Sequence, residues 1–129
     1  MGKILTEISE GELLDKISIL EIKLKEIKDP ELLKEVKKEY KILDEIKKNN
    51  IIFSSEIKSL FLELKEINIK IWQIENEKRL CEKNSTFDEK FIKLSREEFC
   101  TNDKRAQIKS KINKILDSNI KEVKQHTKY

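Results

Sequence analysis

Turn-forming residues are scarce in this chain. Only two glycines and one proline occur among its 129 residues, whereas charged residues make up 41% and apolar residues 37%. Strands and the loops between them need more turn residues than this, but long helices with solvent-exposed faces do not. The apolar residues recur at helical spacing, which argues against a disordered chain. The composition and the spacing together predict an all-α fold.

Helix start signals divide the chain into four segments. The expected N-caps are Ser9, Asp29, Ser54 or Ser55, and Thr86, and a proline directly follows Asp29. The third segment extends from the serines to about residue 83, which corresponds to a helix about 43 Å long. Short joints between segments favour antiparallel neighbours. We predict one domain over residues 1–129, folded as an antiparallel bundle of about four helices with a long third helix.

Two further structural expectations concern the end of the chain and its surface. The sequence CTND at 100–103 predicts a kink in the fourth segment, and residues 119–129 are expected to form a frayed basic tail. The uneven helix lengths leave apolar surface on the longer hairpin. A homodimer is therefore an open alternative to a monomer.

Positive charge is concentrated near the C-terminus. The formal net charge is +3, but residues 104–129 carry eight basic and only two acidic side chains. Such a segment can meet nucleic acid, phosphorylated ligands or anionic lipid. It can also be a solvated helix end, where cations are favourably placed, and we prefer this interpretation. Nucleic-acid binding ranks third among the functions considered, because only Tyr129 accompanies the lysines and no recognition-helix signature is present.

Metal and cofactor chemistry have little support in the sequence. Cys81 and Cys100 have no metal-ligand neighbours at useful spacing, and His126 is the single histidine. We therefore expect no metal, no cofactor and no Ser-His-Asp relay. The N-terminus lacks the apolar run of a signal peptide, and no stretch approaches the length of about 18 apolar residues that a membrane span needs. These features predict a cytoplasmic protein without a membrane span.

One face of the third segment changes from apolar to polar along its length. Asn68, Trp72, Glu75 and Arg79 lie within a wedge of about 80° on a helix. Upstream, the same wedge holds residues with core character, namely Ile57, Phe61 and Leu64. A straight helix cannot rotate away within three turns. We therefore predict that the four polar residues face the interior, with Trp72 as one wall of a pocket.

Polar residues beside the other apolar seams can meet this wedge. Glu12 and Lys16 lie along one border of the first segment. In the fourth segment, polar residues share or adjoin one face: Asn102, Arg105 and Lys109. We predict that these groups form a preorganised pocket for an anionic ligand, with Arg79 and Lys16 as the cations. The alternative is a solvated face, on which Glu75 and Arg79 form an i,i+4 pair worth a few tenths of a kcal/mol.

Three motifs resemble a small bacterial family known as a domain of unknown function. The first is GELLDKISILEIK at 11–23, and the second comprises Asn68, Trp72, Ile74 and Glu75. The third is TNDKRA at 101–106, followed by Lys109, Ile112 and Asn113. Phe99 departs from the family pattern, which has a tyrosine there, so any role of that hydroxyl is absent. The resemblance implies no established activity, but it does imply an association with surface-polysaccharide and glycosyltransferase genes.

The candidate ligand-binding residues combine the polar faces with these motifs: Glu12, Lys16, Asn68, Trp72, Glu75, Arg79, Asn102, Asp103, Arg105 and Lys109. They favour a small accessory protein that binds an anionic small molecule or a protein partner. The resemblance implies bacterial envelope glycan metabolism as its setting. The first alternative is an enzyme that acts on an anionic metabolite by electrostatic catalysis in the bundle interior. The sequence assigns no catalytic residue.

Overall fold

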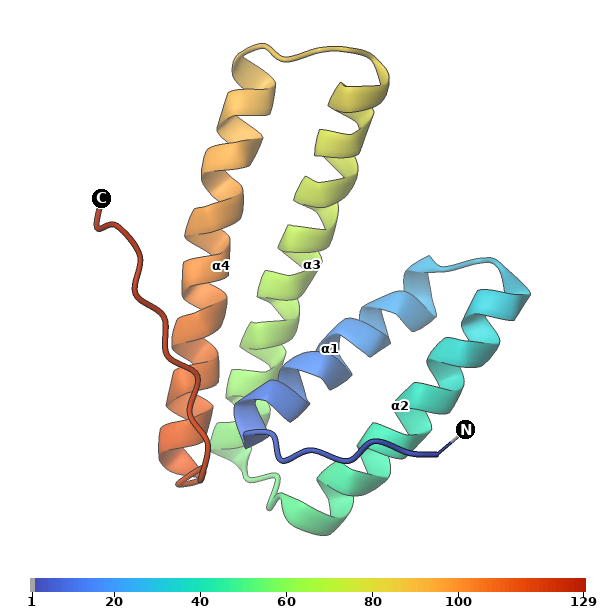
Figure 1. Ribbon diagram of the computed structural model, residues 1–129, viewed down its shortest axis with the longest axis vertical. Helices are drawn as coiled ribbons and strands as arrows, with labels where there is room; N and C mark the ends of the chain where they lie inside the picture. The colour runs from blue at the N-terminus through green and yellow to red at the C-terminus, as the bar shows by residue number, and fades with distance from the viewer. Residues whose placement is uncertain (1) are drawn as a thin grey trace.

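The computed structural model describes residues 2–129, and these residues form four α-helices and no strand (Figure 1). The helices are α1 (Glu10–Glu26), α2 (Pro30–Asn50), α3 (Ser55–Lys83) and α4 (Glu89–Ile115). With 29 residues, α3 is the longest of them. The predictions of an all-α fold and a long third helix are confirmed. Within residues 2–129, no helix combines the length and the apolar character that a membrane span requires.

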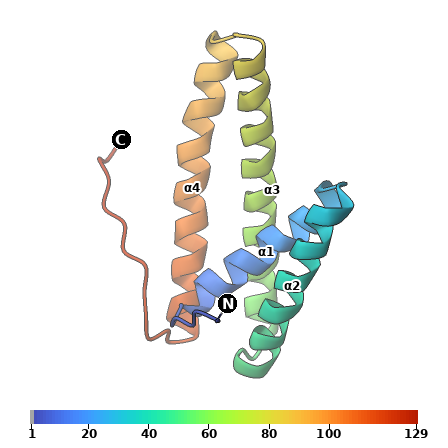
Figure 2. The same cartoon turned by 45° about the vertical axis from the view of Figure 1, so that its right-hand side comes forward.

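The helices form two antiparallel hairpins, α1–α2 and α3–α4. α1 is the central element because it packs against each of the other three helices. α2 takes α1 as its helical neighbour and lies on the outside of the bundle (Figures 1 and 2). α3 and α4 lie side by side, and their far ends extend beyond the α1–α2 hairpin. The far part of the α3–α4 hairpin is therefore a two-helix structure.

Side-chain caps begin the helices where the sequence predicts, except at α4. Ser9 Oγ accepts a hydrogen bond from the backbone N–H of Glu12 at 3.1 Å, and Ser54 caps α3 in the same way. Asp29 caps α2, whose first residue is the proline. The prediction of Thr86 as a cap is wrong, because α4 begins two residues later and Asp88 caps it. α4 then continues without interruption through residues 100–103, so no break in the helix marks the predicted kink.

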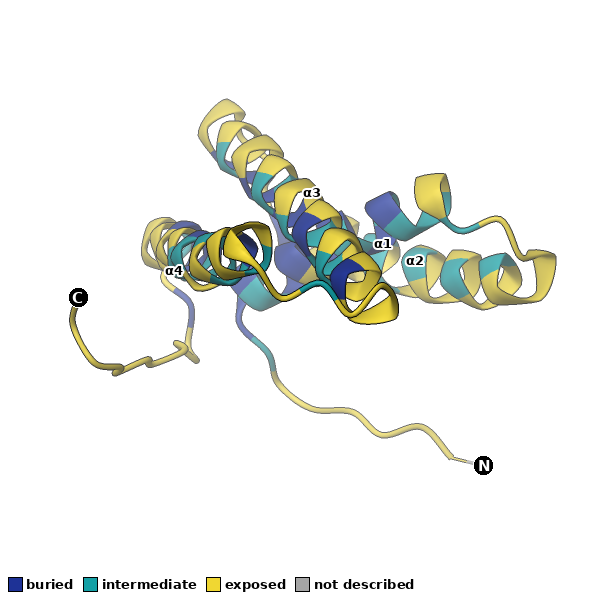
Figure 3. Ribbon diagram, turned by 90° about the horizontal axis from the view of Figure 1, so that it is seen from above, coloured by how far each residue is buried: buried dark blue, intermediate teal, exposed yellow. Residues whose placement is uncertain are grey.

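The main core lies where α1 crosses the α3–α4 hairpin (Figure 3). Its most deeply buried side chains are Leu14, Ile17, Ile57, Leu64 and Ile112. Burial of each such side chain contributes about 1.5–3 kcal/mol. A smaller cluster of Ile74, Cys81 and Leu94 lies between α3 and α4 farther along the hairpin. The bundle therefore has a strong base and a thinly packed extension.

A tight turn ends α4 and sends the chain back along it. Asp117 adopts a left-handed backbone conformation with φ of 50°, and the N–H of Ser118 donates to the carbonyl of Asn113 at 2.9 Å. Such a turn satisfies carbonyls at the end of a helix. Residues 118–129 have no helix or strand, and they follow α4 toward its middle (Figures 1 and 2).

Candidate functional site

A buried carboxylate joins three helices at the base of the bundle. The Asp15 side chain on α1 is only 1% exposed. Its two oxygens accept hydrogen bonds from Arg105 on α4, at 2.9 Å from Nε and 2.5 Å from Nη2. Asn68 on α3 donates to the same carboxylate at 2.9 Å. A buried charge is tolerated only when it is paired and hydrogen-bonded, and Asp15 meets both conditions.

Asn68 is itself held by a second partner. Its Nδ2 also donates to Ser18 Oγ at 2.8 Å, and the Ser18 hydroxyl donates to the backbone carbonyl of Asp15 at 2.7 Å. Asn68 and Ser18 are both buried. Asn68 therefore faces the interior, as the polar wedge predicts, and fixes the orientation of the carboxylate.

Lys109 is the second cation at this position. Its side chain is 9% exposed, and its Nζ lies 2.7 Å from Glu12, 3.0 Å from Glu122 and 3.8 Å from Asp15. Burial alone lowers the pKa of Lys109, but the hydrogen bonds to Glu12 and Glu122 outweigh it, so the pKa is raised. Hydrogen bonds to Asp15 likewise raise the pKa of Arg105 against the effect of burial. Both side chains are therefore cations at neutral pH.

We call this set the Asp15 cluster: Glu12, Asp15, Ser18, Asn68, Arg105 and Lys109. Within residues 2–129, no buried side-chain nitrogen or oxygen lacks a hydrogen-bond partner. The part of the chain that the structure describes also contains no group of three His, Cys, Asp or Glu residues that could hold a metal ion. The cluster is thus a fully paired, rigid polar network.

A groove of about 320 Å³ adjoins the cluster between α1 and α3. We call it the α1–α3 groove, and its lining is Ile19, Ile22, Asn68, Ile71, Trp72, Glu75, Asn76, Arg79 and Arg105. The Trp72 side chain is half-buried in it. Arg105 connects the groove to the cluster, because it binds Asp15 and still exposes 27% of its side chain. Apolar and aromatic walls with a few fixed polar groups are typical of small-molecule sites.

The far end of the polar wedge differs from its prediction. The Arg79 side chain is 78% exposed, so the prediction that it faces the interior is wrong. Arg79 lies toward the end of α3 that extends beyond α1, where α4 is the helix beside α3. Glu75 is 41% exposed and lies 3.5 Å from Arg79. A hydrogen bond with Glu98, together with burial, raises the pKa of Glu75. Both residues line the groove but lie apart from the Asp15 cluster.

The predicted pair of cations is also corrected. Lys16 is 49% exposed and lies 4.0 Å from Glu12, on the solvent side of α1. Asp15, one residue earlier, points into the bundle instead, because successive helix positions are about 100° apart. The cations at the interior are Arg105 and Lys109 rather than Arg79 and Lys16.

The remaining candidates lie on α4 outside the cluster. Asn102 and Asp103 are half-buried, and neither lines the α1–α3 groove. Asp103 accepts a hydrogen bond from the hydroxyl of Tyr129 at 2.6 Å. This bond to Asp103, followed by the interaction with Cys100, raises the pKa of Tyr129. Asp103 thus holds the C-terminal segment.

Asp15 and Ser18 are central here, but they are not among the site residues that the sequence predicts. A detectable signal is their spacing. Gly11, Asp15 and Ser18 recur at steps of four and three, so small or polar residues occupy one inward face of α1. Gly11 shows why a small residue is needed there. A Cβ at this position would lie 2.6 Å from the Lys109 carbonyl.

Fold and site together define a class: a small all-α protein with a buried ion cluster beside a half-apolar groove. Residues 4–128 match the Family of unknown function (DUF6165), and the chain belongs to this family. The resemblance to an uncharacterised domain family is thereby confirmed. No curated protein and no solved structure matches the chain.

Proposed function

We propose that the chain is an accessory protein that binds an anionic, ring-shaped small molecule in the α1–α3 groove. The observation that supports this most is the placement of Trp72 and Arg105 in one groove that three isoleucines also line. An indole and aliphatic side chains offer flat apolar surface to a ring, and a guanidinium offers paired donors to a phosphate or carboxylate. A ligand that has both a flat apolar face and an anionic group fits this combination.

The groove also has groups that would orient such a ligand. Asp15 takes two donors of Arg105 and thereby fixes the plane of the guanidinium. The exposed remainder of Arg105 is then preorganised toward the groove, which lowers the entropic cost of binding. Arg79 at the groove edge is held only by Glu75 at 3.5 Å, so it is free to reach a ligand. Asn76 adds an amide to the lining.

Binding is favoured over catalysis because the reactive groups near the groove already have partners. The charges of Asp15, Glu12 and Lys109 are paired with one another or with Arg105. Electrostatic catalysis needs donors aimed at charge that develops in a transition state, and these donors are aimed at protein carboxylates. Two of the basic side chains near the C-terminus, Arg105 and Lys109, are likewise neutralised, which weakens the case for nucleic acid.

Envelope glycan metabolism is the setting that we propose for this activity. A sugar ring has an apolar C–H face that suits Trp72 and hydroxyls that suit the amide of Asn76. A phosphorylated or acidic sugar adds the anion that the arginines favour. A charged sugar therefore meets the requirements of the groove better than a neutral one.

A thermal-shift titration with glucose 1-phosphate, glucose and inorganic phosphate tests the proposal. A ligand that binds only the native state must raise Tm. We expect glucose 1-phosphate to stabilise the protein more than either fragment does. Trp72→Ala and Arg79→Ala should each lower the affinity for glucose 1-phosphate about ten-fold, which corresponds to about 1.4 kcal/mol of binding free energy.

Arg96→Ala is the matched control, because Arg96 is an exposed arginine of α4 outside the groove. It should leave the response unchanged. The proposal is wrong if glucose 1-phosphate does not raise Tm more than glucose and phosphate do, or if its effect on Tm is the same in Trp72→Ala and in Arg96→Ala.

A further inference from the structure

The chain binds its own C-terminal segment over the Asp15 cluster. We call residues 118–129 the C-terminal strap. Ser118 Oγ donates to Glu10 and also lies 3.1 Å from Asn113 Oδ1, and Asn119 donates to Glu7 at 2.6 Å. Farther along, Tyr129 reaches Asp103. Ser118 is buried, but the contacts of Asn119 and Tyr129 are exposed, so beyond Ser118 the strap is held more weakly than a packed helix.

Glu122 of the strap is a carboxylate in excess of the charge balance of the cluster. The helices already supply two cations and two carboxylates, because Arg105 pairs with Asp15 and Lys109 pairs with Glu12 at 2.7 Å. Glu122 adds a third carboxylate, 3.0 Å from Lys109 Nζ. Its removal would leave the cluster neutral. It would also leave one N–H of the ammonium without its protein acceptor.

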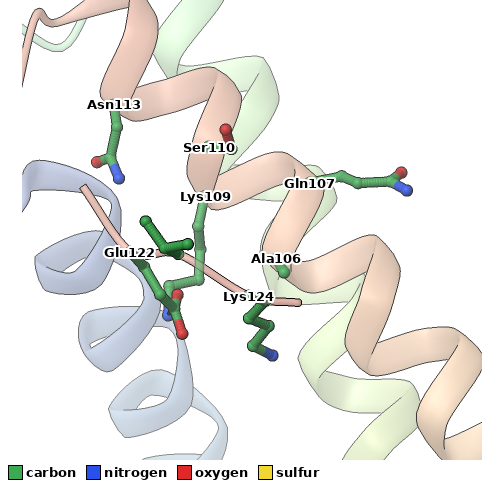
Figure 4. Close-up of a pocket in the computed structure, with 8 residues that line it drawn as sticks. Ala106, Gln107, Lys109, Ser110, Asn113, Glu122 and Lys124 are labelled. Atoms are coloured by element: carbon green, nitrogen blue, oxygen red, sulfur yellow. Dashed lines mark ion pairs between the residues drawn. The ribbon is translucent and has the colours of Figure 1, made fainter. Parts of the chain in front are cut away.

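A hollow of about 350 Å³ lies between α4 and the strap at this point (Figure 4). Lys109, Ser110 and Asn113 line it from α4, and Glu122 and Lys124 line it from the strap. Figure 4 shows the Glu122 carboxylate meeting the Lys109 ammonium across the hollow. The Lys109 ammonium is a donor for an oxyanion, and the place beside it is taken by a carboxylate that comes from an irregular segment. Ser110 and Asn113 line other parts of the hollow.

We infer that Lys109 is a second anion site, which the strap closes with its own Glu122. A free oxyanion, either a phosphate or a carboxylate, competes with Glu122 for Lys109 and releases the strap. The apparent affinity of such a site is reduced by the fraction of molecules in which the strap is closed. This site is separate from the α1–α3 groove, since Trp72 does not line the hollow.

The test is a titration of the full chain with inorganic phosphate, and in parallel with acetate, followed by the backbone amide signals of Ser110 and residues 118–129 in NMR spectra. Glu122→Gln removes the competing charge and keeps the shape. We expect it to bind phosphate about ten-fold more tightly than the unchanged chain does. In the unchanged chain, signals of Ser110 and of the strap should move together, because the anion displaces Glu122. Acetate should act in the same way if carboxylates are also accepted, and an effect of phosphate alone would narrow the site to phosphates.

Asp117→Asn is the matched control. It makes the same change in charge at the start of the same segment, and asparagine tolerates the left-handed conformation of this residue. We expect its phosphate affinity to equal that of the unchanged chain. Equal gains for Glu122→Gln and Asp117→Asn would overturn the inference, because they would report net charge alone.

Lys109→Met in the Glu122→Gln background adds a second check. Phosphate binding should be lost, and the shifts should not move to the lysines of the strap. Shifts confined to Lys121, Lys124 and Lys128 would also overturn the inference. If Lys109→Met does not fold, the comparison of Glu122→Gln with Asp117→Asn still decides the question.

Discussion

Asp15 shows how one side chain can fix the geometry of a site in a highly charged chain. Its carboxylate receives the paired donors of Arg105 and the amide of Asn68, so it connects α1 with both helices of the other hairpin. Net stabilisation from a buried ion pair is small, because desolvation offsets attraction, but the loss of one partner is costly. Asp15 therefore acts mainly by specifying how α1 and α4 meet.

Asp15→Asn should destabilise the fold by about 3 kcal/mol, near the lower end for a broken buried pair because Arg105 is partly exposed. The free energy of unfolding from urea denaturation is the relevant measurement. Asp44→Asn is the control, since Asp44 forms its pairs with Lys47 and Lys48 within α2. That change should cost less than about 1 kcal/mol. Equal losses in the free energy of unfolding would show that the pairs of Asp15 stabilise the fold no more than those of Asp44 do.

Gly11→Ala should destabilise the protein by at least about 1 kcal/mol, although alanine is the better helix former. The added Cβ would lie 2.6 Å from both the Lys109 carbonyl and Asn113 Oδ1. It would also disturb the hydrogen bond from the Gly11 N–H to Asn113, which is 2.7 Å long. Gly2→Ala has open space around it and should be neutral. A stabilised Gly11→Ala variant would contradict this close approach of α1 and α4.

At the residue scale, the sequence predicts the inward face of Asn68 because core residues precede it at helical spacing. It does not distinguish Asp15 from the acidic residues around it, since charges flank every seam in this chain. The inward prediction for Arg79 fails because helical periodicity gives the direction of a side chain around the helix axis. It does not tell whether another helix covers that side at that position along the axis. Glu122 could not be found, because its contact with Lys109 depends on a turn at Asp117.

Among the elements, α1 positions the site and the far α3–α4 hairpin does not. α1 contributes Glu12, Asp15 and Ser18 to the cluster and two isoleucines to the groove. The far hairpin has a small apolar cluster, and large apolar side chains are exposed around it: Leu80, Phe87 and Ile92. The predicted homodimer remains a prediction, and these side chains are the surface on which it would depend.

Hydrogen exchange should therefore separate the two ends of α3 and α4. Residues 76–94 should exchange faster than residues 13–20 and 108–113, because fewer buried contacts oppose local opening there. Mass spectrometry of peptides from the exchanged protein gives both rates in one experiment. Uniform protection along α3 would contradict the contrast between the well-packed main core and the thinly packed far end of the hairpin. It would instead favour burial of the far end against a partner.

Helix boundaries were largely predictable because capping is local chemistry. Ser9, Asp29 and Ser54 precede their helices with the expected hydrogen bonds. α4 was misjudged by two residues because Thr86 and Asp88 both have capping side chains, and the chain turns sharply between α3 and α4. How α1 crosses the α3–α4 hairpin could not be predicted, because that crossing is set by long-range packing rather than by helical periodicity.

For the whole molecule, the raised pKa values of Lys109 and Arg105 give stability a definite dependence on pH. A group whose pKa is raised by folding contributes stability that is complete below its unfolded-state pKa and is lost as pH rises through the folded-state value. For Lys109 this loss begins above the ordinary lysine value of 10.5.

Urea unfolding between about pH 7 and pH 11.5 measures this loss against the ordinary titration range of lysine. Lys109→Met should lower stability at neutral pH and flatten the decline above the ordinary lysine pKa. Lys111→Met, at an exposed position of α4, should leave the shape of the curve unchanged. A decline that is identical in all three proteins would show that Lys109 is not a source of it.

The central claim is that the α1–α3 groove beside the Asp15 cluster is a binding surface. Trp72 is the only tryptophan of the chain and lines this groove, so its fluorescence reports on the groove directly. The most direct measurement is the emission of the unchanged protein during titration with glucose 1-phosphate. The account predicts a saturable change in Trp72 emission that glucose or inorganic phosphate alone does not reproduce at equal concentration. Binding detected by calorimetry with no change in Trp72 emission, or no binding at all, would contradict it.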